Sequence, residues 1–377
     1  MSGAPKSSWP ELRDVFNHAL VEDIAKRVAS HAPRFSAADF VTEVATGLPA
    51  LALKGRSRLI AEKLHHFLPA PFPKALRLLN LAMGADDRSG GIEGMSGFRF
   101  MPFLDFVGMY GVDTPEISFD ALEIMTKYFS AEFAIRPFLA RHTALTLARA
   151  RGWARHPDWR VRRLASEGLR PRLPWAERVP PLIGDPMPVI RILDVLRADP
   201  HPNVRNSVAN SLNDIAKDHP ALAVATAARW NKSGDATSSW IAKRGLRTLI
   251  KAGDAAALKV CGFDTKAPVT LAAFRLAPTT ARIGGQVAFS FRLSLRGGGA
   301  ATVAVDYALS RPLANGASAE KVFKLAVKKL VPGAPLKLAG KVNLKQLSTR
   351  RYYPGRYAVT IIANGQRLKS RVFTASP

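Results

Sequence analysis

A single carboxylate stands within a short and strongly basic stretch of this chain. Residues 161–175 read VRRLASEGLRPRLPW, in which Glu167 lies among four arginines and ahead of Trp175. A helix starting at residue 161 would bury one apolar stripe, formed by Val161, Leu164, Ala165, Gly168 and Leu169. Arg163, Glu167 and Arg170 would then share the opposite face. The simplest interpretation is an exposed ion pair worth about 0.3–0.5 kcal/mol.

Two segments of the chain are similar to each other. Residues 156–169 and 199–212 align Val161 with Val204, an offset of 43 residues, and residues 238–249 form a third and weaker copy. Helical repeats of about 40–47 residues are typical of HEAT proteins. Stacked helix pairs of this kind build a curved solenoid with a concave binding face.

The exposed faces of the three copies differ while their apolar faces are kept. The first copy has Arg163, Glu167 and Arg170 on the exposed face. The equivalent positions are Asn206, Asn210 and Asn213 in the second copy, with Asp214 beside them, and Lys243, Arg247 and Lys251 in the third. Cationic and amide side chains suit phosphates and the polar edges of nucleic acids. We therefore expect Arg163, Arg170, Asn206, Asn210, Lys243 and Arg247 to bind DNA. Glu167 and Asp214 would repel phosphate, so their presence needs another reason.

Cleavage of a glycosidic bond in the nucleic acid supplies such a reason. Breaking a C1′–N bond builds positive oxocarbenium character on the sugar, which a nearby carboxylate stabilises. Glu132 could join Glu167 and Asp214 in this role, although a position two residues after Ser130, a plausible N-cap, also suits a residue that complements a helix dipole. Trp175 could stack on a base or deoxyribose, or pack in the core.

Composition points to a polyanionic partner. The 377 residues carry a net charge of +26, with a sequence pI near 10.8, and such basic excess is typical of nucleic-acid binders. No run of 18 or more apolar residues exists, and the N-terminus does not resemble a signal peptide. We expect a cytoplasmic, monomeric protein that does not bind membranes.

Motifs for other chemistries are missing from the sequence. We find no HExxH or His/Cys cluster with metal-ligand spacing, no phosphate-binding GxxxxGK[ST] loop, no GxSxG elbow and no dinucleotide fingerprint. The stretch SGGIEGMSG at residues 89–97 follows no strand pattern and is predicted to be a loop. We therefore expect neither a metal nor a cofactor.

The pattern divides the chain into two domains. Residues 1–266 show helical periodicity interrupted by Pro, Gly and Asp, which predicts an all-α repeat solenoid. Residues 267–377 show alternating runs such as VAFSFRLSL separated by glycine-rich turns, which predicts a β-sandwich of immunoglobulin-like size. This second part carries +16 of the net charge, so we expect it to be an accessory DNA-binding domain.

Three segments resemble a known family. YFSAEFAIRPFLARH, RVRRLASEGLRPRLPWA and NVRNSVANSLNDIAKDHP are similar to the signature segments of the HEAT-like-repeat alkylpurine DNA glycosylases, in the AlkC branch, whose members often carry a C-terminal immunoglobulin-like domain. The resemblance implies excision of cationic N-alkylated bases such as 3-methyladenine and 3-methylcytosine from duplex DNA, without cofactor and without full base flipping. It also implies that Glu132, Glu167 and Asp214 are the active-site acids, Trp175 the active-site aromatic residue, and Arg163 and Arg170 the phosphate ligands.

Two alternatives remain open at the level of sequence. A non-catalytic HEAT-repeat scaffold would bind DNA with the same basic faces, but it would gain nothing from acids placed on them. An adaptor for an acidic protein would more often expose apolar patches on its concave face. No lysine within the three segments stands out as a Schiff-base nucleophile, which favours a monofunctional glycosylase that leaves an abasic site.

Overall fold

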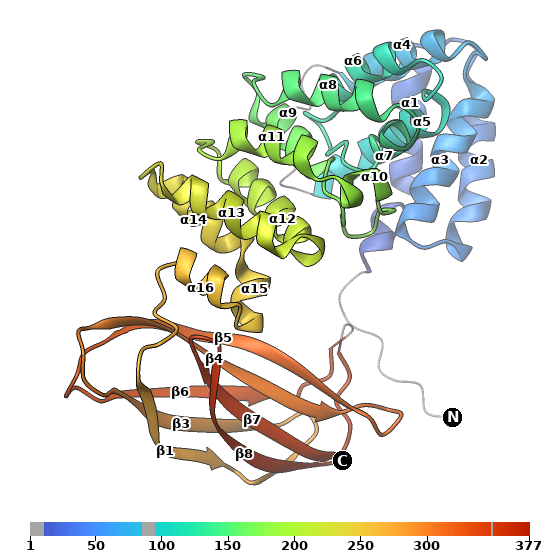
Figure 1. Cartoon of the computed structure of the whole chain (residues 1–377). Coiled ribbons are helices and arrows are strands. Elements are labelled where there is room, and N and C mark those ends of the chain that lie inside the picture. The colour runs from blue at the N-terminus through green and yellow to red at the C-terminus, as the bar shows by residue number, and fades with distance from the viewer. Residues whose placement is uncertain (1–10, 85–94, 348–349) are drawn as a thin grey trace. The chain divides into compact units, whose positions relative to one another are not determined.

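The computed structural model describes residues 11–84, 95–347 and 350–377. The chain divides into two compact units, Met1–Ile215 and Ala216–Pro377, and the division falls within a helix, α12. The change from helices to strands comes later, after residue 260 (Figure 1). A domain boundary at residue 266 therefore stays a prediction.

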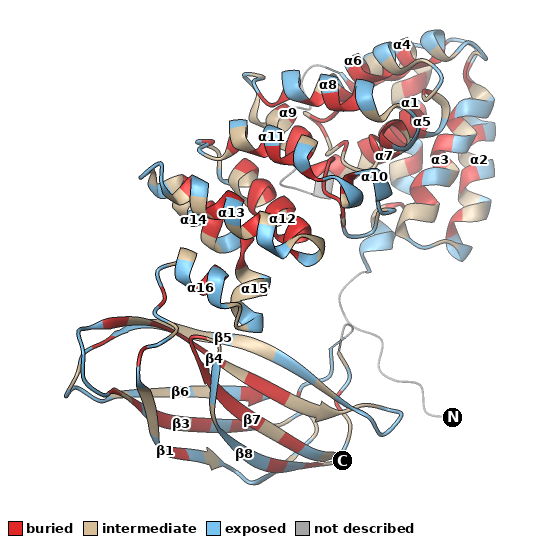
Figure 2. Cartoon of the chain, viewed as in Figure 1, coloured by how far each residue is buried: buried red, intermediate tan, exposed pale blue. Residues whose placement is uncertain are grey.

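The described part of the first unit is helical throughout. Its elements are η1 (Leu12–Val15), α1 (His18–Ala29), α2 (Ala37–Gly47), η2 (Leu48–Ala50), α3 (Leu53–Phe67), α4 (Phe72–Met83), η4 (Met95–Phe100), α5 (Met101–Tyr110), α6 (Pro115–Met125), α7 (Arg136–Arg141), α8 (Thr143–Trp153), α9 (Trp159–Glu167), α10 (Pro180–Gly184), α11 (Met187–Leu196) and α12 (Pro202–Asp218). Most helices bury one side and expose the other (Figure 2), as expected for amphipathic repeats.

Helix α9 follows the expected apolar stripe. Val161, Leu164, Ala165 and Leu169 are each at most 1% exposed, which confirms the buried face. The helix begins at Trp159, two residues earlier than expected, because the Asp158 side chain accepts a hydrogen bond from the Arg160 backbone N–H and caps it. It ends at Glu167, so Arg170 lies beyond the helix.

The repeat offset of 43 residues is reproduced in the hydrogen bonds that start α9 and α12. Asp158 N donates to His156 Nδ1 at the start of α9, and His201 N donates to Asp199 Oδ1 at the equivalent place in α12, both at 2.9 Å. Likewise, Arg162 Nη1 donates to Pro157 O at 2.8 Å, and Arg205 Nη1 donates to Pro200 O at 3.1 Å. Neighbouring copies also bind each other, because Arg162 donates to both carboxylate oxygens of Asp199 at 2.6 and 3.1 Å. In the third copy Ile241 lies one helical turn further from its capping residue, Asp235.

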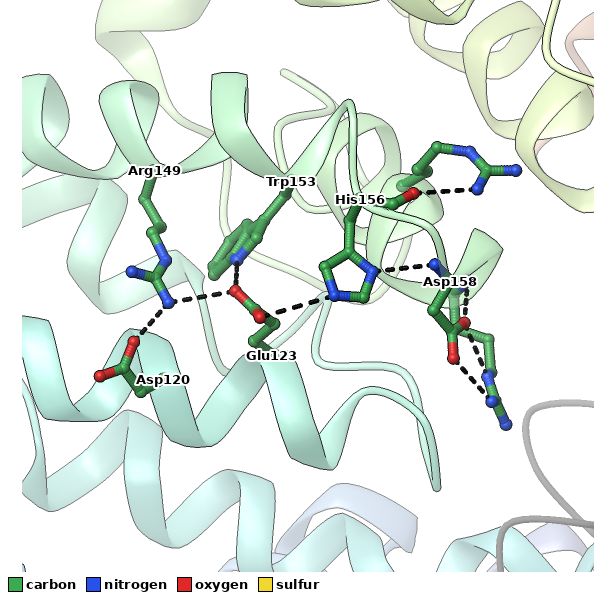
Figure 3. Close-up of polar contacts among 8 residues, drawn as sticks. Asp120, Glu123, Arg149, Trp153, His156 and Asp158 are labelled. Atoms are coloured by element: carbon green, nitrogen blue, oxygen red, sulfur yellow. Dashed lines mark hydrogen bonds and ion pairs between the residues drawn. The ribbon is translucent and has the colours of Figure 1, made fainter.

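A polar cluster joins α6, α8 and the start of α9 (Figure 3). Glu123 on α6 accepts hydrogen bonds from Trp153 Nε1 at 2.7 Å and Arg149 Nη2 at 3.0 Å, both on α8. His156 Nδ1 accepts the Asp158 N–H, so the ring proton is on Nε2, which lies 3.6 Å from Glu123. Burial alone would raise the pKa of the Asp158 carboxyl, but hydrogen bonds from Arg160 hold it below its usual value. These contacts fix the N-terminal end of α9.

The second unit combines four helices with a β-sandwich. Its helices after α12 are α13 (Pro220–Asn231), α14 (Ala236–Gly245), α15 (Arg247–Ala252) and α16 (Ala255–Val260), and its strands are β1 (Val269–Ala277), β2 (Thr280–Arg282), β3 (Gln286–Leu295), β4 (Ala301–Pro312), β5 (Ser318–Leu330), β6 (Leu336–Asn343), β7 (Gly355–Ala363) and β8 (Gln366–Ser376). One sheet has the order β1-β3-β6 and the other β2-β8-β7-β4-β5. All pairs are antiparallel except β2 with β8.

The sandwich core follows the expected alternation in β3 but not in β4. Inward residues of β3, such as Val287, Phe289 and Phe291, are buried between exposed or half-buried neighbours. In β4 four successive residues, 303–306, are buried, because Leu258 and Phe263 from the helical segment pack against Ala304 on the other face of the sheet. The expected order of a helical repeat region followed by a β-sandwich is confirmed.

Hydrogen bonds of Asn364 and a close approach of two glycines attach the helical segment to the sandwich within this unit. Asn364 Nδ2 donates to Asp264 O at 2.7 Å, and Asn364 Oδ1 accepts the Ala304 N–H at 2.7 Å. Gly253, with φ of +80°, packs so tightly that a Cβ there would lie 3.1 Å from Gly365 Cα. The absence of side chains at both glycines lets the two backbones meet.

Two further expectations concern particular segments. In the predicted loop at 89–97, residues 89–94 lie outside the described residues, and Met95 begins the short helix η4. In the part of the chain that the structure describes, no helix is long and apolar enough to cross a membrane.

Replacing Gly253 by Ala tests the backbone contact. Both the positive φ and the clash with Gly365 should destabilise the second unit, by about 2 kcal/mol or more of unfolding free energy. Gly262→Ala is the matched control, because Gly262 has φ of +77° and open space around its would-be Cβ, so that only the backbone cost of about 1 kcal/mol applies. Urea denaturation measures both variants, and equal losses would contradict the contact.

Candidate active site

Arg170 lies between two carboxylates from neighbouring repeats. Its Nη1 donates to Glu167 Oε1 at 2.6 Å, and its Nε donates to Asp214 Oδ2 at 2.8 Å. All three residues are buried, with exposed fractions of 7% for Arg170, 6% for Glu167 and 1% for Asp214. Burial alone would lower the pKa of the guanidinium, but its contacts with Glu167 and Asp214 raise it above its usual value. The two acids thus share one charged donor.

A second arginine joins the third acid to this group. Arg163 Nη1 lies 3.0 Å from Glu132 Oε2, and the other terminal nitrogen of Arg163 lies 4.0 Å from Glu167 Oε1. Ser130 Oγ donates to Glu132 Oε2 at 2.7 Å and accepts from Arg163. The three predicted acids and the two predicted arginines therefore form one connected cluster, although they come from positions 132–214 of the sequence.

A cavity of about 330 Å³ opens onto this cluster. Glu132, Glu167 and Arg170 line it together with aromatic side chains, which are Phe98, Phe129, Phe133 and Trp175. Asp214 does not line the cavity and lies behind Arg170. Carboxylates between apolar walls feel a lower dielectric than they would in water, so their field on a charged group in the cavity is stronger.

Trp175 is placed at this cavity by an unusual backbone conformation. Its φ is +62°, a region that side chains other than Gly, Asn and Asp seldom adopt, and its side chain is 69% exposed. Lys54 Nζ donates to the Trp175 carbonyl oxygen at 2.7 Å and lies 4.7 Å from the centre of the Phe133 ring. Burial, with Arg58 nearby, lowers the pKa of Lys54. An exposed aromatic residue held in a strained conformation is typical of a binding site.

Arg136 anchors the loop that carries Arg170 and Trp175. This buried guanidinium donates from Nη1 to Gly168 O at 3.0 Å and to Arg170 O at 2.8 Å, and from Nη2 to Glu177 O. Burial lowers the pKa of Arg136 to about 10, so it is still protonated at neutral pH. The loop after α9 is therefore fixed at three carbonyl groups.

Three interpretations drawn from the sequence are wrong. Glu167 is not an exposed ion-pair partner, because it is buried and binds Arg170 in the loop after α9. Ser130 does not cap a helix, since α7 begins at Arg136 with Ile135 as its N-cap, and the serine hydroxyl binds Glu132 instead. Core packing of Trp175 is excluded by its exposure.

The remaining predicted DNA ligands lie elsewhere. Asn206 and Asn210 are half-buried on α12, on the same face as Asp214, but they do not line the cavity. Lys243 and Arg247 belong to the second unit and line another cavity. Among the described residues no three His, Cys, Asp or Glu side chains come together as a metal site would require.

Sequence reasoning missed Lys54 and Arg136. Lys54 is 121 residues from Trp175 in the chain, and no local pattern connects the two. Arg136 did leave a signal, because it is a lone cation in the apolar run FAIRPFL. A charged residue at such a position must find buried partners.

Replacing Arg136 by Met tests how strongly the loop is anchored. Three carbonyl groups would lose a charged donor, and each unsatisfied group costs about 1–3 kcal/mol, so we expect a loss of about 3 kcal/mol or more of unfolding free energy. Arg141→Met is the control, because its ion pair with Asp113 is exposed and worth about 1 kcal/mol at most. Chemical denaturation that gave the two variants the same stability would show that Arg136 does not hold the loop.

Comparison with known proteins identifies the family and confirms the architecture. Residues 270–376 match the family model described as the C-terminal Ig-like domain of the uncharacterised protein YhaZ. The chain is 35% identical over 357 residues to "Uncharacterized protein YhaZ" of Bacillus subtilis strain 168, covering 94% of this chain and 97% of that protein. It is 36% identical to the solved structure of Pseudomonas fluorescens alkylpurine DNA glycosylase AlkC bound to DNA containing an abasic site analog, with a TM-score of 0.91 and coverage of 98% of this chain and 100% of that one. The chain belongs to the AlkC branch of the HEAT-like-repeat alkylpurine DNA glycosylases.

Proposed function

We propose that this protein is a DNA glycosylase of base excision repair that removes cationic N-alkylated bases, of the 3-methyladenine and 3-methylcytosine type, from duplex DNA. The observation that carries the proposal is the cavity in which Glu132 and Glu167 stand between aromatic walls, each held by an arginine. Membership of the AlkC branch supports the same reaction class.

The chemistry needs little more than fixed negative charge. A base alkylated at N3 is already positively charged, so it leaves without protonation by a general acid. As the C1′–N bond lengthens, the positive charge moves onto the sugar, and Glu132 and Glu167 stabilise it electrostatically. Water then adds at C1′, and an abasic site remains. The reaction is therefore monofunctional hydrolysis and requires neither a metal nor a cofactor.

The other residues of the cluster support these two acids. Asp214 adds its charge from behind Arg170 and fixes the guanidinium that orients Glu167. Trp175 offers its exposed ring to the deoxyribose or a base at the lesion. An electrostatic site of this kind acts on the sugar, so the base need not be fully flipped out of the duplex.

DNA contacts come from both units. Arginine has five N–H donors, and we assign those that Arg163 and Arg170 do not use in their ion pairs to the phosphates beside the lesion. Asn206 and Asn210 extend this surface along α12, and Lys243 and Arg247 add cations from the second unit. Residues 267–377, with a net charge of +16, act as an accessory DNA-binding domain. A non-catalytic scaffold is the alternative, but it does not explain buried acids at a cavity.

Glu167→Gln separates catalysis from binding. The change removes a charge that faces the cavity while Asp214 still pairs with Arg170, so single-turnover excision of 3-methyladenine should slow by about 10² or more. Binding to DNA with an abasic-site analogue should be unchanged or slightly tighter, because one repulsive charge is gone. Glu43→Gln is the control, since Glu43 forms an exposed ion pair with Lys63. An excision rate of Glu167→Gln within about threefold of the parent would refute the catalytic role.

Salt dependence tests the DNA-binding surface. With roughly six to ten phosphate contacts, affinity for undamaged duplex should fall by about 10³–10⁵ between 50 and 200 mM salt. Fluorescence anisotropy with a labelled duplex gives the slope. A flat response would remove DNA from the partners of this protein.

A further inference from the structure

The second unit contains a basic cavity that the glycosylase site does not use. Its volume is about 410 Å³, within the range of about 300–1,000 Å³ typical of small-molecule sites. The lining residues come from the helical segment and from strands β4 and β5, and they are Trp240, Lys243, Arg244, Arg247, Ile250, Lys251, Phe263, Ala304, Asp306, Lys324 and Val327. Five of them are cations, so the cavity suits an anionic ligand.

Aromatic rings and cations stand side by side in this cavity. Lys243 Nζ lies 4.7 Å from the centre of the Phe263 ring, and the Arg244 guanidinium lies 5.4 Å from the centre of the Trp240 ring. Trp240 is 44% exposed, so part of its side chain is accessible to a ligand. Phosphates bound by cations next to bases stacked on aromatic rings are the common pattern of nucleotide recognition.

Asp306 is the single acid among the described residues that line the cavity. A β-bulge after Val305 makes Asp306 pair with Lys324 on β5 instead of Leu325, and bulges commonly redirect a side chain in this way. Asp306 is 4% exposed, and the charged groups that act on it are Lys251 on α15 and Lys324 on β5. Its partner on the other neighbouring strand, β7, is the apolar Ile362.

We propose that this cavity binds one nucleotide unit, with the phosphate between Lys251 and Lys324 and the base on Trp240. The proposal extends the proposed DNA contacts of Lys243 and Arg247, so it rests on DNA binding by the second unit, but it does not depend on excision. The nucleotide unit belongs either to a DNA strand or to a free nucleotide, and the phosphate-and-base chemistry is the same for both.

Asp306 makes this binding sensitive to pH. Burial raises the pKa of its carboxyl to about 6, against the opposing effect of Lys251 and Lys324. Above this pH the carboxylate competes with the phosphate for the two lysines, and below it the neutral acid does not. Nucleotide affinity should therefore increase as the pH falls through about 6.

The dinucleotide TpT is a suitable probe, because its phosphodiester keeps one negative charge throughout this pH range. Calorimetry with the full-length protein should show TpT binding that is weakened at least tenfold in Lys251→Ser/Lys324→Ser. Both lysines are exposed, so the variant should fold. The matched control is Lys328→Ser/Lys329→Ser, which removes the same charge from exposed positions of β5 outside the cavity. Equal weakening in both variants would overturn the proposal, because only net charge would then matter.

Two further variants test the parts of the cavity. Asp306→Asn should bind TpT at pH 8 as tightly as the parent does at pH 5.5, and its affinity should not depend on pH. The affinity of the parent for TpT should increase by about threefold or more between pH 8 and pH 5.5. Trp240→Ala should weaken the binding of TpT but leave the binding of inorganic phosphate unchanged. A pH dependence that persists in Asp306→Asn, or thymidine that binds as well as TpT, would contradict the proposal.

Duplex binding by the lysine variant distinguishes the two sources of the nucleotide. If Lys251→Ser/Lys324→Ser also weakens duplex binding more than its control, the nucleotide unit belongs to a strand. If only TpT binding is lost, the ligand is a free nucleotide. Excision of 3-methyladenine by the parent protein is measured in parallel. A parent that excises the base but does not bind TpT refutes this inference alone, and TpT binding without any excision refutes the glycosylase alone.

Discussion

The structure of the site depends on one buried guanidinium. Arg170 binds Glu167 at 2.6 Å and Asp214 at 2.8 Å where all three side chains are nearly excluded from water. Buried charges are tolerated only when they are paired, so the end of α9, the loop after it and α12 must keep their register for any of the three to be stable. The hydrogen bonds that repeat at the start of α9 and α12 provide this register.

This arrangement explains how acids can persist on a protein that binds phosphate. Each carboxylate contacts one of two arginines, so the cluster repels a polyanion less than three isolated acids would. Glu132 and Glu167 nevertheless line the cavity, and their positions are fixed before a substrate arrives. In the proposed reaction, a preorganised field of this kind would cost no rearrangement when positive charge develops on the sugar. Arg136 and Lys54 hold the loop that closes the group with Trp175.

The fold could be predicted from sequence because it leaves local patterns, and the three predicted acids do lie in one cluster. The apolar stripe of α9, the 43-residue repeat and the alternation in β3 follow from periods of helix and strand. Burial of Glu167 could not be predicted, since it depends on how the loop after α9 places Arg170, and Arg170 is bound by Asp214 of the next repeat, 44 residues further along the chain. The same holds for Lys54 at Trp175 and for the bulge that turns Asp306 toward Lys324.

The central claim is that fixed negative charge at a cavity promotes the loss of bases that are already cationic. The most direct measurement is to incubate the purified protein with randomly methylated duplex DNA and identify the released bases by mass spectrometry. The account predicts release of 3-methyladenine and 3-methylcytosine, and no release of the neutral lesion O6-methylguanine. Release of neutral and cationic bases at similar rates, or release of none, would contradict it.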